Sequence, residues 1–131
     1  MPLTDVTIRL LNDTDLPAYK ALRDVGLQHD PEAFTSDFDT ASALPPATYA
    51  TRLGQPPDDH FILGAFDASG AMLGAVVCER ESQLKKRHEA QLVGMIIVPK
   101  LRKRGIGKAL LQEFDQLVRR LPGLEQVVLS V

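Results

Sequence analysis

A glycine-bearing loop with basic flanks joins an apolar run to a helical pattern, and it is the strongest sign of chemistry in the chain. The apolar run Leu92–Val98 stops at Pro99, a basic loop follows, and Gly105-Ile106-Gly107 leads into the helical pattern. The first turn of a helix has backbone N–H groups without partners and carries the positive end of the helix dipole. A phosphate or pyrophosphate binds readily at such a place.

The residue types in this loop suit an anionic ligand. Glycine at position 105 has no Cβ to keep the backbone away from phosphate oxygens. Arg102, Lys103, Arg104 and Lys108 put positive charge where the anion would lie. The spacing fits neither a Walker A loop, which needs Gly-Lys-Ser/Thr, nor a dinucleotide fingerprint, which needs a third glycine. The competing interpretation is an ordinary strand-to-helix turn with solvated surface charges.

The same residues resemble a known family signature. Residues 102–107, Arg-Lys-Arg-Gly-Ile-Gly, fit the Arg/Gln-x-x-Gly-x-Gly/Ala pattern of the GNAT superfamily of acetyl-CoA-dependent N-acyltransferases. The approach Ile97–Arg102 is similar to the family's apolar-x-Pro-x-x-Arg stretch, and Lys108–Leu111 is similar to the start of its next helix. Residues 30–36, Asp-Pro-Glu-Ala-Phe-Thr-Ser, also resemble a segment of many small bacterial members.

The resemblance implies a fold and a reaction. We expect an α/β (α+β) fold over residues 1–131, with a mixed, mostly antiparallel sheet and a strand-loop-helix-strand unit that binds acyl-CoA. A primary amine would attack the thioester of acetyl-CoA directly, without a covalent acyl-enzyme. Backbone N–H groups of Met95, Ile96 and Ile97 would serve the acetyl carbonyl and the pantetheine arm. The loop residues expected to hold the pyrophosphate are Arg102, Lys103, Arg104, Gly105, Ile106, Gly107 and Lys108.

The resemblance leaves the general base open. Some relatives carry a glutamate at the position of Gln91, and a glutamine takes no proton at neutral pH. Glu89 lies two residues earlier on the same face of a strand, and Glu79 and Glu81 share a face of the neighbouring strand. Each of these three candidates is either a base that acts through an ordered water or a solvated surface acid.

No metal site is expected. The three histidines, His29, His60 and His88, lack the spacing of metal ligands. Cys78 lies in the middle of an apolar run without an adjacent histidine motif, so we expect a core residue rather than a nucleophile.

Composition narrows the class of protein. The chain has 131 residues, 44% hydrophobic content and a formal net charge of −2, which are ordinary for a globular domain. No apolar run approaches the ~20 residues that span a bilayer, and no secretory signal is evident. With a single cysteine, a reducing cytoplasm is the simplest location. The mildly acidic balance and 5% aromatic content argue against nucleic-acid binding through Lys100–Lys108.

Apolar periodicity predicts the elements that must position the loop. The run Asn12-Asp13-Thr14-Asp15 offers several caps for a first helix that stops at Gly26, and Asp67–Gly70 predicts a hairpin turn. The final strand-helix-strand unit predicts two parallel neighbouring strands. The predicted strands cover residues 6–11, 60–66, 72–81, 91–98 and 125–131, and the later helices cover 46–53 and 108–121.

Two regions bear on the substrate and on assembly. Residues 28–59 are polar and rich in Pro and Asp, and the resemblance places them in the wall of the acceptor site. Peptide N-termini, polyamines, amino acids and antibiotics all stay open as acceptors. The resemblance also implies a helix and strands beyond residue 131. We therefore expect a shortened domain whose last strand pairs with a second copy to form a homodimer. A non-catalytic acyl-CoA-binding module is the alternative function.

Overall fold

A sheet of five strands organises the described part of this computed structural model, which comprises residues 6–29, 40, 42–54, 60–80, 89–101, 105–120 and 126–129. The strands lie side by side in chain order, and the first four are antiparallel neighbours. The last strand pairs with the fourth in parallel, which confirms the predicted mixed sheet. They are β1 (Thr7–Leu10), β2 (His60–Phe66), β3 (Met72–Arg80), β4 (Glu89–Ile97) and β5 (Gln126–Leu129).

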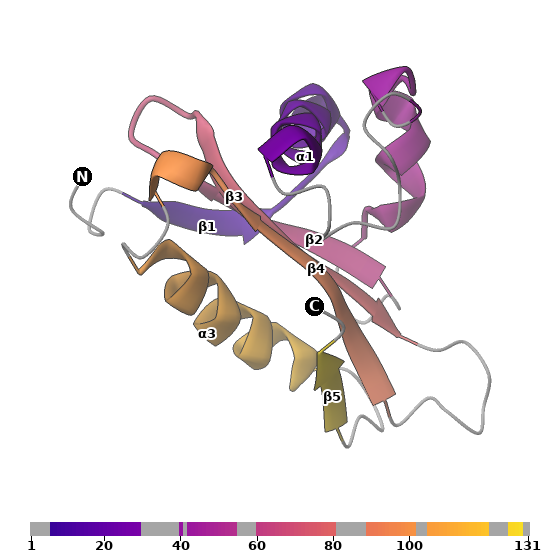
Figure 1. Ribbon diagram of the computed structural model, residues 1–131. Coiled ribbons are helices and arrows are strands. Elements are labelled where there is room, and N and C mark those ends of the chain that lie inside the picture. The colour runs from indigo at the N-terminus through magenta and orange to yellow at the C-terminus, as the bar shows by residue number, and fades with distance from the viewer. Residues whose placement is uncertain are drawn as a thin grey trace.

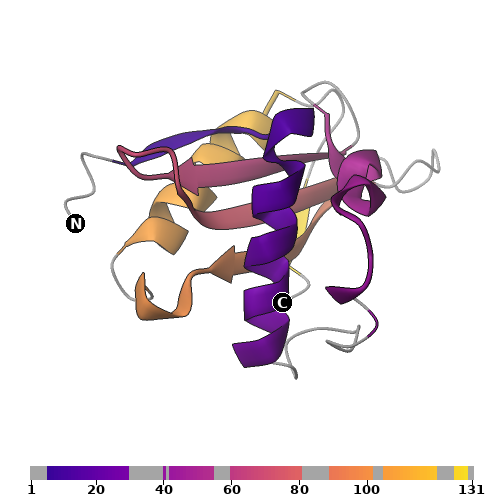
Figure 2. The same ribbon diagram turned by 90° about the horizontal axis from the view of Figure 1, so that it is seen from above.

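Helices cover both faces of the sheet (Figure 1). On one face, α1 (Leu16–His29) crosses the strands and is accompanied by the 3₁₀ helix η4 (Pro46–Arg52), as Figure 2 shows. On the other face lies α3 (Ile106–Val118), which the 3₁₀ turn η6 (Pro99–Leu101) precedes. Within the described residues, no helix is both long and apolar enough to cross a bilayer.

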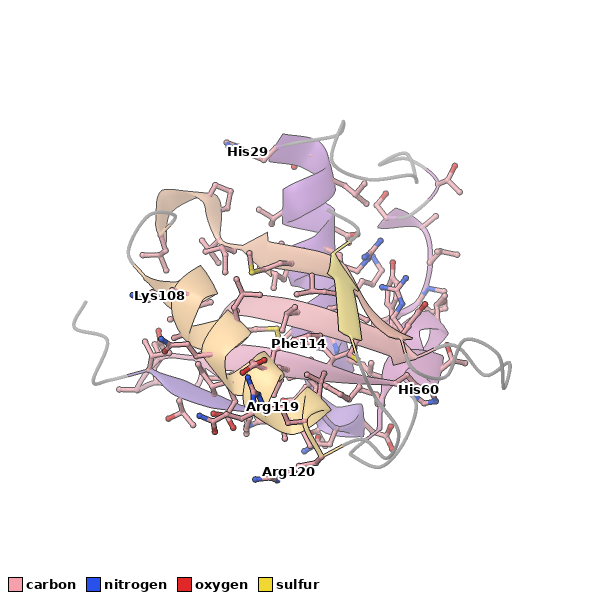
Figure 3. All side chains as sticks on the ribbon, turned by 90° about the horizontal axis from the view of Figure 1, so that it is seen from below. His29, His60, Lys108, Phe114, Arg119 and Arg120 are labelled. Atoms are coloured by element: carbon pink, nitrogen blue, oxygen red, sulfur yellow. The ribbon has the colours of Figure 1, made fainter. Side chains whose placement is uncertain are left out.

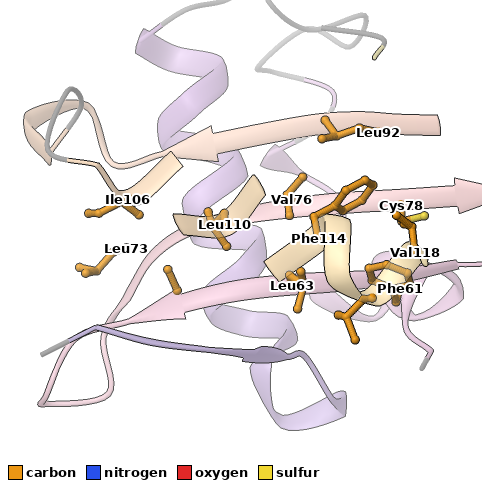
Figure 4. Packing of buried hydrophobic residues seen from close by; sticks show 12 residues of the cluster. Phe61, Leu63, Leu73, Val76, Cys78, Leu92, Ile106, Leu110, Phe114 and Val118 are labelled. Atoms are coloured by element: carbon orange, nitrogen blue, oxygen red, sulfur yellow. The ribbon is translucent and has the colours of Figure 1, made fainter. Parts of the chain in front are cut away.

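Alternation along the strands fills one core on each side of the sheet. Phe61 and Leu63 of β2 point toward α3, whereas Ile62 between them points toward α1. The α3 side is the larger core and is drawn in Figure 4. It includes an apolar stripe of α3, whose buried members are Leu110, Phe114, Leu117 and Val118.

The first helical segment begins at one of the predicted caps but ends later than predicted. Asn12 is the cap: its side chain accepts from the Thr14 N–H at 3.0 Å, while the Asp15 carboxylate accepts from the Asn12 N–H at 2.9 Å. This reciprocal box opens the 3₁₀ turn η2 (Asp13–Asp15), which runs into α1. Gly26 does not stop the helix, because burial of the following Leu27 outweighs the roughly 1 kcal/mol helix penalty of glycine.

The hairpin between β2 and β3 is confirmed. The Asp67 carboxylate accepts from the backbone N–H groups of Ser69 and Ala71, each at 2.9 Å. Gly70 completes the turn with φ at +89°, a left-handed conformation that favours glycine.

Two strand glycines, Gly64 and Gly74, lie where other groups come close. A Cβ on Gly64 would lie 2.6 Å from Cδ2 of Leu11. A Cβ on Gly74 would lie 2.7 Å from Cδ1 of Ile97 and 3.0 Å from the carbonyl oxygen of Ile96. The contact with the Ile96 carbonyl involves the backbone of β4, so Gly74 sets how closely β3 and β4 approach.

Replacing Gly74 tests this constraint. Gly74→Ala should lower the free energy of unfolding by about 1–3 kcal/mol, because β4 backbone cannot move as a flexible side chain would. Gly94→Ala is the matched control, since a Cβ there meets nothing within 4 Å. Urea denaturation followed by circular dichroism measures both variants, and equal stability of the two would contradict the constraint.

Asp15 gives a prediction about pH. The hydrogen bond from Arg9 lowers the pKa of Asp15 below its ordinary value, as does the Asn12 N–H, while burial opposes them. A carboxyl whose folded pKa is depressed stabilises the fold above its unfolded pKa of about 3.9, and that stabilisation is lost as the pH falls through the folded pKa. Asp15→Asn should therefore destabilise by about 1–2 kcal/mol at pH 7 and progressively less below about pH 4. Asp13→Asn is the control, and a pH-independent effect of Asp15→Asn would contradict the assignment.

Candidate functional site

The glycine loop ends in a helix start that no side chain caps. Gly105 is the N-cap of α3 with φ at 85° and ψ at 1°, and it has no side chain to accept from the first turn. The first helical hydrogen bond runs from the Ala109 N–H to the Gly105 carbonyl at 3.0 Å. Ile106, Gly107 and Lys108 precede that donor, so their N–H groups have no intrahelical acceptor. They are directed along the helix axis, where an anion would meet them.

The helix start lies against β4. Cε of Met95 is 3.6 Å from the position that a Cβ would take at Gly107, which is ordinary van der Waals contact. Ile106 is buried in the α3-side core, and Lys108 is exposed at the same end of α3. Figure 3 shows Lys108 and His60 at opposite ends of the sheet. The N-terminal end of α3 is thereby fixed to the strand that precedes it.

A β-bulge divides β4 into two parts. Gly94 pairs with Val77, but Leu92 pairs with Cys78, so Val93 is an extra residue in β4. Such a bulge bends a strand and increases its local twist. The parallel pairing with β5 extends only as far as Leu92, opposite Leu129. Beyond the bulge, no described residue pairs with the outer edge of β4.

The peptide groups of Ile97 point toward this outer edge. The Ile96 carbonyl lies 3.0 Å from the Cβ position of Gly74, so it points toward β3. The Val98 N–H donates to the Leu73 carbonyl of the same neighbour at 2.9 Å. In a planar trans peptide, the C=O of one residue and the N–H of the next point in opposite directions. Both polar groups of Ile97 therefore point away from β3.

The alternation of backbone directions along the strand shows that the polar groups of Met95 also point away from β3. Successive residues of an antiparallel strand alternate between bonding one neighbour and facing the other side. Met95 therefore presents its N–H and C=O at the outer edge, as Ile97 does, while those of Ile96 are directed into the sheet. Of the three predicted backbone donors, Met95 and Ile97 are the ones on the free edge.

Two of the predicted acids, Glu79 and Glu89, lie on the neighbouring strands β3 and β4. Glu79 is exposed on β3, with His60 of β2 on one side of it and Gln91 of β4 on the other. Glu89 is the first residue of β4, with its backbone opposite Gln126. Glu81 lies outside the described residues, as do Arg102, Lys103 and Arg104 of the loop. Among the described residues, no group of three or more His, Cys, Asp or Glu is arranged to hold a metal ion.

Sequence reasoning missed a group of four residues on the α1 face. The buried rings of Tyr19 and Tyr49 meet edge to face, with centroids 5.4 Å apart. Arg52 donates from Nη1 to the Tyr19 hydroxyl at 3.0 Å, and its Cζ lies 5.4 Å from the Tyr49 centroid. The Cζ of Arg23 lies 5.1 Å from the same centroid. We call Tyr19, Arg23, Tyr49 and Arg52 the tyrosine–arginine cluster.

The environment of Arg23 keeps it charged. Burial alone would lower the pKa of Arg23, but the hydroxyls of Tyr19 and Tyr49 outweigh burial, so the pKa lies above its ordinary value. The sequence held one signal for this cluster. Each arginine follows a tyrosine by one helical turn, Tyr19 to Arg23 and Tyr49 to Arg52, but only the fold brings the two pairs together.

Comparison with known families decides the assignment. The acetyltransferase (GNAT) family matches residues 25–131, which is most of the chain and includes the loop, β4 and α3. The chain belongs to the GNAT acetyltransferase family. A search of curated protein sequences found no significant match.

Solved structures share the fold of this GNAT protein. It is similar to an acetyltransferase of the GNAT family from Streptococcus pneumoniae, with TM-score 0.74 and 24% identity over 95% of this chain and 73% of that one. The PaiA N-acetyltransferase of Thermoplasma acidophilum, solved with coenzyme A, has a TM-score of 0.69 and 19% identity. The match covers 87% of this chain and 72% of that one. An aminoglycoside acetyltransferase from an uncultured soil metagenomic sample, solved with sisomicin, has a TM-score of 0.72 and 17% identity. The match covers 98% of this chain and 78% of that one.

Substitution at Gly105 tests the anion site. Gly105→Glu should weaken coenzyme A binding by at least about a hundredfold, or ~2.7 kcal/mol, because bulk and negative charge would occupy the position of a phosphate. Gly70→Glu is the matched control, since it imposes a similar left-handed strain on the β2–β3 turn. Isothermal titration measures both variants. An unchanged affinity in a folded Gly105→Glu protein would refute the site.

Proposed function

We propose that this protein transfers an acetyl group from acetyl-CoA to a primary amine by direct attack. Membership of the GNAT acetyltransferase family supports an acyl-CoA-dependent acyltransferase. The observation that carries the proposal is the continuity between two sets of backbone donors. The free edge of β4 at Met95 and Ile97 leads through one short segment to the uncapped first turn of α3 at Gly105.

The two sets of donors fit different parts of acetyl-CoA. The first turn of α3 offers amides and a helix dipole for the pyrophosphate, and the exposed Lys108 adds a positive charge. The free edge of β4 offers alternating N–H and C=O groups, with which the amides of pantetheine would pair as an added strand does. The absence of a Cβ at Gly105 leaves room for the phosphate oxygens.

The reaction is nucleophilic substitution at the thioester. The nitrogen of a neutral amine attacks the carbonyl carbon, a C–N bond forms, and the C–S bond breaks to release coenzyme A as a thiolate. The amine loses one proton, and the thiolate takes one up. An N–H of Met95 or Ile97 directed at the carbonyl oxygen would stabilise the tetrahedral oxyanion, an effect typically worth several kcal/mol in water-excluded sites.

Three further features stay predictions from the sequence. These are acetyl rather than a longer acyl group, a cytoplasmic location, and a homodimer formed through β5.

The proposed activity is tested by thiol release. Acetyl-CoA with a panel of amino acids, short peptides, polyamines and aminoglycosides should yield coenzyme A at a rate that depends on the amine, and mass spectrometry should find the acetylated amine. Tight binding of acetyl-CoA with no release on any acceptor would instead identify a non-catalytic acyl-CoA-binding module.

Three amide substitutions assign the base. Glu79→Gln, Glu81→Gln and Glu89→Gln each remove one candidate proton acceptor while they preserve side-chain size. Loss of the base should lower kcat by about a hundredfold or more, because positioned general bases contribute roughly 10²–10⁴. Coenzyme A affinity should be unchanged in each variant. If all three retain wild-type kcat across the pH range, none of these carboxylates is the base.

A further inference from the structure

His60 of β2 and Glu79 of β3 are opposite each other on the α1 side of the sheet. They are register partners in the antiparallel pairing of the two strands. Two positions along each strand, Ile62 and Val77 belong to the α1-side core. Because side chains alternate along a strand, His60 and Glu79 lie on that same face.

The backbone pairing brings these two residues close. The Leu11 N–H donates to the Ile62 carbonyl at 2.9 Å, so the backbone groups of Ile62 point to the β1 side. His60 has the same period and also turns its backbone away from β3. His60 and Glu79 therefore form a non-hydrogen-bonded pair, the kind in which opposite side chains lie closer together. Their Cβ atoms are expected about 4.5–5.5 Å apart.

The α1 side of the sheet is open at Glu79. β3 is the middle strand, and residues 73–78 are all buried, but Glu79 is exposed. Neither α1 nor η4 therefore covers its carboxylate, and a molecule from solvent can reach it. Nδ1 of His60, in contrast, is buried and has no hydrogen-bond partner in the part of the chain that the structure describes. Such a nitrogen destabilises a fold, which points to a donor that arrives during function.

The proposed path of the acyl donor leads toward this pair. With the pyrophosphate at the first turn of α3, the thioester lies farther along β4 toward its bulge. Figure 3 shows His60 at the end of the sheet opposite Lys108. Met95 pairs with Val76, three residues before Glu79, which puts the Cα atoms of Met95 and Glu79 about 11 Å apart. An amine, one ordered water and a glutamate side chain together can span that separation.

We propose that Glu79 and His60 form a relay that takes up the proton lost by the acceptor amine. The inference rests on the proposed acetyl transfer, and it adds a residue on β2 to the reaction. As the C–N bond forms, an N–H bond of the amine breaks, and its proton passes through the water to a carboxylate oxygen of Glu79. The carboxyl O–H then donates to Nδ1 of His60, which takes the proton while Nε2 keeps its own. The imidazolium finally releases one proton to solvent.

The chemistry of the two groups suits this order of events. An ionised carboxylate only accepts hydrogen bonds, as does an imidazole nitrogen that carries no proton. The two groups therefore bond to each other only when a proton lies between them. The ordinary pKa of an imidazole is about 6.5 and that of a glutamate-type carboxyl is about 4.3. At neutral pH an imidazole thus holds a proton more readily, which returns the carboxylate to its ionised form.

Variants of His60 test the relay through thiol release with the fastest amine of the panel. His60→Gln keeps a polar side chain that cannot take up the proton, so kcat should fall at least about tenfold while both KM values change by less than about twofold. Free imidazole should restore part of the kcat of His60→Ala, which a purely structural role would not allow. Glu113→Gln, in α3 on the other side of the sheet, is the control and should keep wild-type kcat.

A double variant shows whether the two residues act as one unit. His60→Gln combined with Glu79→Gln should be no slower than Glu79→Gln alone. Losses that multiply, or wild-type kcat in His60→Gln, would overturn the relay and leave the transferase proposal intact. If the wild-type protein releases no thiol with any acceptor, the transferase proposal fails and the relay fails with it.

The imidazole ring gives a readout that does not need turnover. In a ¹H–¹⁵N spectrum of the ring nitrogens, assigned by the signals that His60→Gln removes, neutral His60 should carry its proton on Nε2. Nδ1 is then free to accept from Glu79, as the relay requires. A proton on Nδ1 of the neutral ring would overturn the relay whatever the activity of the protein.

Discussion

Unpaired backbone groups are the constraint on which the rest of this structure depends. Buried or half-buried N–H and C=O groups cost about 1–3 kcal/mol each when they lack a partner, so folded chains pair nearly all of them. In the described part of this chain, neither strand pairing nor helix pairing satisfies the outer edge of β4 after its bulge or the first turn of α3. Water or a ligand must satisfy them. The two sets follow one another in the chain, so one extended ligand can satisfy both.

Two cores keep those donors in place. The side chains of Met95 and Ile97 pack on the α3 side, and Ile96 packs on the α1 side, so β4 is held from both faces. The donors of β4 are backbone atoms of Met95 and Ile97, whose side chains pack against the α3-side core. Their positions are therefore fixed by core packing rather than by flexible surface chains, which is the arrangement that precise sites require. The close approach at Gly74 adds to this by fixing the spacing between β3 and β4.

Local patterns carried the predictions that succeeded. The hairpin turn at Asp67–Gly70 and the glycine before α3 depend on a few neighbouring residues, and the sequence displays them directly. The choice among the caps stayed open because Asn12 and Thr14 are both good caps, and it depends on whether Asp15 can close the reciprocal box.

Non-local features were beyond the sequence. The bulge at Val93 arises because β4 has one more residue than β3 between two paired positions, and only the pairing of the two strands reveals it. The tyrosine–arginine cluster likewise joins residues 33 positions apart, Tyr19 and Arg52, across two helices. Neither the residues around the bulge nor Tyr19 and Arg52 have a spacing in the sequence that marks a site.

The two halves of the site differ in how they depend on sequence. In the proposed function, backbone atoms recognise the acyl donor, so any chain that reproduces this strand, loop and helix offers the same donors. That is consistent with a shared fold at 17–24% identity. An acceptor amine would be recognised by side chains, which a different sequence on the same backbone would replace. A fold comparison therefore carries information about the donor and little about the acceptor.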